Sequence, residues 1–150
     1  MRFFQVFALI TALFTLQPAQ ADVLPTDGTP VHFGKAYAYP TVPARPNGAV
    51  FVKVKNLTDH DVKIVSASSP IAKRVELHTH AMVDGRMSMY PVDYVTVPAH
   101  ETHELKPTGD HVMLMLLDAP LKVGDLFPVT FMLDDGSSYT IDASVISLVQ

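Results

Sequence analysis

The sequence of 150 residues contains no cysteine. Without cysteine the chain cannot form a disulfide framework, a thiolate zinc site, a Cys-His-Met electron-transfer copper site or a catalytic thiol. Basic residues are also few, since 11 Lys and Arg stand against 15 Asp and Glu and give a formal charge of −4. Neutralising a phosphate backbone takes clustered Lys and Arg, so the composition argues against a nucleic-acid partner.

Long apolar runs are absent beyond the first residues of the chain. Arg2 is the only charge before Asp22, Phe3 to Leu16 is largely apolar, and Ala19-Gln20-Ala21 has the small-x-small pattern of a processing site. This order predicts a secretory signal peptide over residues 1–21, cleaved after Ala21. A short membrane anchor is the alternative, although the run falls short of the roughly 20 residues that cross a bilayer. We therefore expect an exported single domain over residues 22–150, with no stable membrane insertion after cleavage.

Turn residues are frequent, with 12 prolines and 7 glycines, and apolar residues alternate with polar ones between them. Alternation of period two is typical of half-buried strands, and Asp135-Gly136 between two such stretches predicts a hairpin. The pattern predicts an all-β domain of roughly seven to nine strands, an antiparallel sandwich or Greek-key barrel. The clearest expected strands are Val31–Tyr39, Ala49–Lys55, Asp61–Ser66, Phe127–Leu133 and Tyr139–Val145, and the single short helix-permissive segment is Ser69–Arg74.

Histidine and methionine gather in one stretch around an Asp84-Gly85 pair, which is a strong signal for a two-residue hairpin turn. That turn places His80 opposite Met89 and leaves His78 diagonal to Met89. The same register sets Met82 against Met87, so that five donor side chains crowd one face of the hairpin.

A second cluster, His111, Met113 and Met115, shares one face of a later strand. Taken singly, each of these residues is most simply a core methionine or a histidine at a polar edge. The whole set favours a metal site, because thioether sulfur is a soft neutral donor that zinc, calcium and magnesium use poorly and Cu(I) accepts well. Two His and two Met around one Cu(I) would also need no thiolate in an oxidising compartment.

A longer-range spacing joins the two clusters. His78 is followed by ten residues and Met89, and then by twenty-one residues and His111-Val112-Met113. With this spacing the chain resembles the periplasmic copper chaperones of the copper A centre, the PCu(A)C family. The resemblance spans roughly residues 31–145.

The resemblance implies a cupredoxin-like sandwich that holds one Cu(I) through His78, Met89, His111 and Met113. It implies a metallochaperone in the periplasm that carries copper toward the copper A site, with cytochrome oxidase subunit II or a copper-insertion factor as acceptor. It selects His78 where hairpin geometry favours His80, and His80, Met87 and Met115 stay as exchange or supporting candidates.

Other functions remain open at this stage. A periplasmic copper buffer or resistance protein would bind the same ion without delivery, and a secreted structural sandwich would use the cluster only for packing. His100 and His103, beside Glu101 and Glu104, form either a weak hard-donor site or an exposed polar turn. We expect no enzymatic activity, because the sequence has no Gly-x-Ser-x-Gly, His-Glu-x-x-His or phosphate-binding glycine motif.

Overall fold

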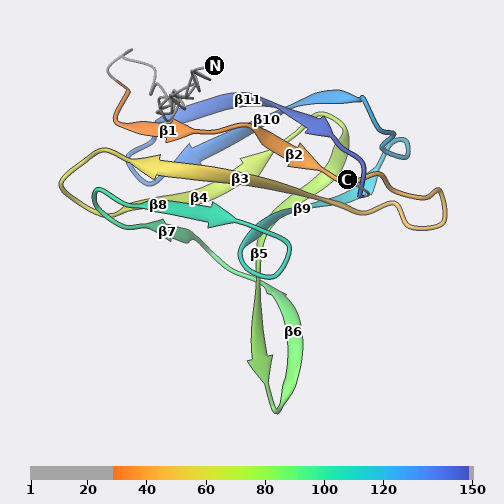
Figure 1. Ribbon diagram of the computed structural model, residues 1–150, viewed down its shortest axis with the longest axis horizontal. Helices are drawn as coiled ribbons and strands as arrows, with labels where there is room; N and C mark the ends of the chain where they lie inside the picture. Colours follow the sequence, from red (N-terminus) through yellow and green to blue (C-terminus); the bar gives the residue numbers. More distant parts are fainter. Residues whose placement is uncertain (1–28, 149–150) are drawn as a thin grey trace, which may run out of the picture.

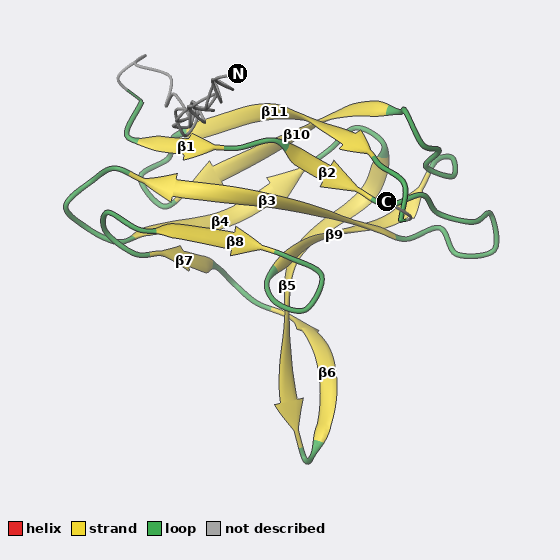
Figure 2. Ribbon diagram, viewed as in Figure 1, coloured by secondary structure: helices red, strands yellow, loops and turns green. Residues whose placement is uncertain are grey.

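A computed structural model describes residues 29–148 of the chain, so the expected signal peptide and its cleavage site lie outside the described residues. The described part consists of eleven strands joined by turns and loops (Figures 1 and 2). The strands are β1 (Val31–Phe33), β2 (Ala36–Ala38), β3 (Gly48–Asn56), β4 (Val62–Ser68), β5 (Ala72–Val83), β6 (Arg86–Pro91), β7 (Val95–Val97), β8 (Thr102–Leu105), β9 (His111–Leu117), β10 (Leu126–Leu133) and β11 (Ser138–Val145). The expected all-β class is confirmed.

The strands follow the spatial order β6-β5-β9-β3-β2-β11-β10-β4-β7, and β1 and β8 add to β3. Neighbours are antiparallel except β2 and β11. The nine-residue strand β3 joins two parts of the sheet, because its first half pairs with β2 and β9 and its second half pairs with β1 and β8. The curled sheet encloses one core, whose largest fully buried side chains include Phe131, Ile64, Leu105 and Leu114.

The β5–β6 hairpin projects from the body of the sandwich (Figure 1). Its turn residues Asp84 and Gly85 have φ angles of 49° and 75°. Positive φ at both central positions defines a type I′ turn, which matches the twist of paired strands and favours Asp-Gly. The turn pairs Val83 with Arg86 and thereby sets the register of the whole hairpin.

Two details of the expected strand pattern are wrong. Val31–Tyr39 is two short strands rather than one, because the chain breaks at Gly34, whose N–H donates to the carbonyl of Lys53. With such short strands the described part exceeds the seven to nine expected. The helix-permissive segment Ser69–Arg74 contains no helix: it is a turn at Pro70 and Ile71 followed by the first three residues of β5, whose pairing with β9 begins at Ala72. Within residues 29–148 no helix offers enough length and apolar character to cross a membrane.

Candidate metal centre

The predicted ligands lie on three adjacent strands, because β6, β5 and β9 are neighbours in the sheet. His80 on β5 is opposite Met89 on β6, and His78 is opposite His111 on β9. Paired residues of neighbouring strands share a face, so these side chains lie on the sheet face opposite the buried Leu77–Val112 pair. The hairpin register expected from Asp84-Gly85 is confirmed.

A hollow of about 310 Å³ opens on this face. Imidazole and thioether groups from all three strands reach it, next to the aromatic wall of Tyr39 and Phe51. The described residues that line it are Tyr39, Pro40, Thr41, Asn47, Gly48, Ala49, Phe51, His80, Met89, Pro107, His111 and Met113. Three of the four predicted ligands, Met89, His111 and Met113, therefore meet at one hollow. The fourth, His78, is not in this lining, and His80 is.

His111 is almost fully buried, with 2% of its surface exposed, and its ring centroid is 5.1 Å from that of His80. Its Nδ1–H donates to the carbonyl of Gly109 at 3.0 Å, and Nδ1 of His80 approaches the same oxygen at 3.4 Å. When the ring is neutral and Nδ1 carries the proton, Nε2 has an unprotonated lone pair that can bind a metal. A histidine whose other nitrogen donates to a backbone carbonyl is oriented as metal-binding histidines usually are.

Burial lowers the pKa of His111 from its ordinary value of 6.5, and the nearby His80 and His78 lower it further. The ring is therefore neutral at neutral pH, which is the form that binds a metal. As pH falls through about 6.5, the unfolded chain binds a proton at this position that the folded chain does not bind. The free energy of unfolding must then decrease, until the pH reaches the pKa of the folded state.

We accordingly expect the urea midpoint of the metal-free protein to decrease between about pH 7.5 and about pH 5.5. A His111→Gln variant should show a smaller decrease, because glutamine does not titrate. Urea unfolding curves at several pH values, followed by circular dichroism, measure both. Identical pH dependence in the two proteins would show that His111 is not the group responsible.

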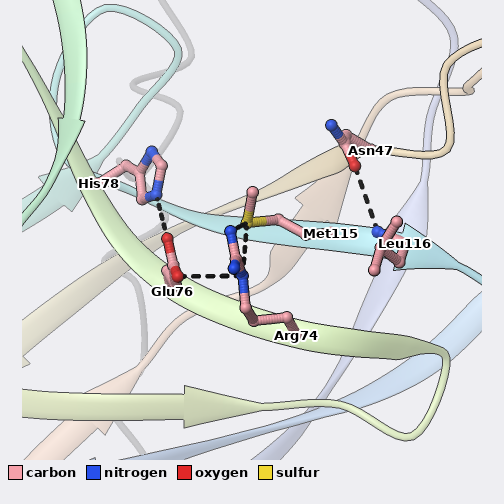
Figure 3. Close-up of polar contacts among 6 residues, drawn as sticks. All are labelled: Asn47, Arg74, Glu76, His78, Met115 and Leu116. Carbon is pink, nitrogen blue, oxygen red and sulfur yellow. Dashed lines mark hydrogen bonds and ion pairs between the residues drawn. The ribbon is translucent and has the colours of Figure 1, made fainter.

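His78 lies beside His111, with ring centroids 5.9 Å apart, and 6% of its surface is exposed. Its Nε2–H donates to a carboxylate oxygen of Glu76 at 2.8 Å (Figure 3). Its Nδ1 is the one buried side-chain nitrogen or oxygen among the described residues that has no hydrogen-bond partner. Buried polar atoms are rarely left unpaired, and an oriented imidazole with a bare buried lone pair is what a metal ligand requires.

The hydrogen bond from His78 lowers the pKa of Glu76, and Arg74 lowers it further. Arg74 Nε lies 3.1 Å from the other Glu76 oxygen, so Glu76 is held between the arginine and the histidine (Figure 3). The thioether sulfur of Met115 accepts from the same guanidinium, at 3.3 Å from Nε and 3.2 Å from Nη2. The sulfur of Met115 is thus already bonded to Arg74 and is not in the lining of the hollow. Glu76 places a carboxylate next to His78.

The other histidines considered from the sequence are paired with separate carboxylates. His100 Nε2 is 2.8 Å from Asp59 Oδ1, and His103 Nε2 is 2.7 Å from Asp110 Oδ2. No group of three or more His, Asp or Glu side chains suited to hold a metal ion occurs within residues 29–148.

Several residues of the site were not anticipated from the sequence. Gly109 supplies the carbonyl that orients two imidazoles, and the Lys106–Asp110 loop is closed by two backbone hydrogen bonds. The aromatic wall and the Arg74–Glu76 pair were also missed. Glu76 and Arg74 had a local signal, because residues two and four positions before His78 on a strand share its face.

Comparisons with known proteins identify the family and the fold. Residues 31–145 match the family described as "Putative lipoprotein LpqE-like". The chain is 33% identical over 131 residues to "Putative lipoprotein Lxx21020" of Leifsonia xyli subsp. xyli, which covers 85% of this chain and 76% of that protein.

Solved structures with the same fold include the Cu(I) form of DR1885 from Deinococcus radiodurans in solution. That structure is 32% identical, covers 83% of this chain and 84% of its own, and has a TM-score of 0.63. The copper-bound PCuAC domain from PmoF2 is 18% identical, covers 79% of this chain and 94% of its own, and has a TM-score of 0.66. The expected cupredoxin-like sandwich is thereby confirmed as the fold of PCuAC domains. The chain belongs to the LpqE-like family of putative lipoproteins.

Proposed function

We propose that this protein is a metallochaperone that holds one Cu(I) and carries it toward the copper A site of cytochrome oxidase. The observation that carries the proposal is the meeting of two thioethers, Met89 and Met113, with the imidazole of His111 at one hollow. His78, matched to the family spacing, supplies the fourth ligand through its buried and unpartnered Nδ1.

The donor set selects the ion. No carboxylate is among the described residues that line the hollow, so a hard cation such as Mg²⁺ or Ca²⁺ would find no suitable ligand there. Thioether and imidazole suit Cu(I), and the four groups bring no charge of their own. Glu76, hydrogen-bonded to His78 and ion-paired with Arg74, orients the His78 ring. The Cu(I) form of DR1885, at 32% identity, supports the same ion.

The proposed ligand set favours transport of Cu(I) over catalysis. Four protein donors around Cu(I) leave no open position for a substrate, so we propose no enzymatic turnover. Met89 is 45% exposed and lies on the edge strand β6, so an acceptor can reach it before the buried ligands. Ligand replacement one donor at a time then moves the ion to a tighter acceptor, which we propose is cytochrome oxidase subunit II or a copper-insertion factor.

Export fits the same role. We propose that residues 1–21 are a signal peptide cleaved after Ala21 and that the protein acts in the periplasm. The family of putative lipoproteins to which the chain belongs supports export. The sequence itself has no cysteine, the residue that carries thioether- or thioester-linked lipid.

Titration with Cu(I) against a competing Cu(I) chelator, under anaerobic and reducing conditions, tests the proposal. We expect one tightly bound equivalent in the wild-type protein. A secreted structural sandwich would show no tight stoichiometric binding, and that result would overturn the proposal.

Growth of a strain that lacks this protein distinguishes copper delivery from copper buffering. Loss of oxidase activity at low copper, restored by added copper, supports delivery. Sensitivity to excess copper with normal oxidase activity would instead identify a buffer or resistance protein.

A further inference from the structure

The β5–β6 hairpin carries a second pair of opposed methionines beyond the hollow. Met82 on β5 faces Met87 on β6, and their side chains are 63% and 61% exposed. Neither lines the hollow. Two large apolar side chains side by side on a projecting hairpin bury little surface, so packing does not explain them.

The register puts this pair on the same face as the ligands. Met82 is two residues from His80 on β5, and Met87 is two residues from Met89 on β6. Two residues span roughly 6.6 Å along a strand. In a two-residue hairpin the pair next to the turn, Val83–Arg86, is hydrogen-bonded, and the following pairs alternate. Both Met82–Met87 and His80–Met89 are therefore non-hydrogen-bonded pairs, whose side chains lie closest together.

We propose that Met82 and Met87 form a second, weaker Cu(I) site through which copper enters and leaves the hollow. The inference rests on the proposed function of the protein as a Cu(I) carrier. Two thioethers are soft, neutral donors that need no deprotonation, and two donors leave coordination positions open. A ligand from an acceptor or donor protein occupies those positions during transfer.

The geometry lets the ion move without being released into water. Cu(I) at Met82 and Met87 is roughly 6.6 Å along the strands from His80 and Met89, and the flexible methionine side chains can move to span that distance, so a new ligand bonds before an old one leaves. The charges at the turn do not oppose a cation, because Asp84 precedes Arg86 and their charges offset each other. The exposed outer pair binds weakly, whereas the partly buried hollow holds the ion more tightly.

Titration of the full chain with Cu(I) alone, followed through the ¹³C-labelled methionine methyl groups by NMR, tests this site. The first equivalent should shift the methyl resonances of Met89 and Met113. The second equivalent should shift those of Met82 and Met87 together. Met132, 45% exposed on β10, serves as the control for non-specific binding and should not move.

A Met82→Leu/Met87→Leu variant keeps the apolar volume and removes both sulfurs. It should take up the first equivalent as the wild type does and lose the response to the second. It should also exchange Cu(I) more slowly between a loaded, unlabelled copy and a metal-free, labelled copy.

Three results would overturn the proposed site at Met82 and Met87. Their methyl resonances could shift with the first equivalent, shift only together with that of Met132, or not shift at all. An unchanged exchange rate in the variant would remove the transfer role. A first equivalent that leaves Met89 and Met113 unmoved would instead refute the proposed function.

Discussion

Replacing Met113 by alanine is expected to weaken Cu(I) binding at least about 100-fold, more than the loss of a residue that only supports a ligand. Met113 lies opposite Ala49 on the face that carries the hollow, and its neighbours Val112 and Leu114 point into the core. The substitution therefore removes a soft donor and leaves the core intact. Competition titration measures the affinity, and circular dichroism with urea unfolding checks the fold.

A Met132→Ala variant is the matched control, because it deletes an equally large thioether on β10, outside the described lining of the hollow. It should bind Cu(I) as the wild type does. Equal affinity in the Met113→Ala protein would exclude Met113 from the site. His111→Ala should lose comparable affinity, although truncating a side chain that is 2% exposed also lowers stability.

Replacing Glu76 by alanine is expected to weaken Cu(I) binding by about 10–100-fold, the usual cost of losing the group that orients a metal-binding histidine. The carboxylate accepts a hydrogen bond from the Nε2–H of His78, which leaves the lone pair of Nδ1 free to bind a metal ion. Glu76→Gln keeps an oxygen acceptor but loses the negative charge, so its loss should be smaller. Competition titration with Cu(I) ranks the three proteins.

Arg74→Ala is the control for Glu76, because it breaks the Arg74–Glu76 ion pair and leaves the Glu76–His78 hydrogen bond in place. It should change Cu(I) affinity little. Wild-type affinity in Glu76→Ala would show that Glu76 does not position a ligand. It would also direct attention to His80, which a parallel pair of His78→Ala and His80→Ala variants would test.

Local sequence signals predicted much of the fold. Asp84-Gly85 fixed the hairpin register because a type I′ turn tolerates those two residues at positive φ. The β10–β11 hairpin followed from alternation around Asp135-Gly136. The break at Gly34 and the four partners of β3 could not be predicted, since they depend on strands that lie far away in the sequence.

The candidate site was predictable in its chemistry more than in its geometry. The spacing of Met89, His111 and Met113 anticipated three donors that meet at the hollow. Whether His78 or His80 is the donor from β5 depends on how β5 pairs with both β6 and β9. It also depends on the carbonyl of Gly109, which contacts His80. Local pattern carries no information about that carbonyl, because it comes from a loop 29 residues away from His80. The choice of His78 stays a prediction.

The edge position of β6 has a mechanical consequence. In the described sheet β6 pairs with β5 alone, so an ion bound by both Met89 and His111 would tie this edge strand to the body of the protein. Because coupling between two binding events is reciprocal, an interaction that holds the hairpin against the body raises the affinity for the ion, and an interaction that pulls the hairpin outward lowers it. A partner protein that pulls this hairpin outward would thereby weaken ion binding without contacting the buried imidazoles.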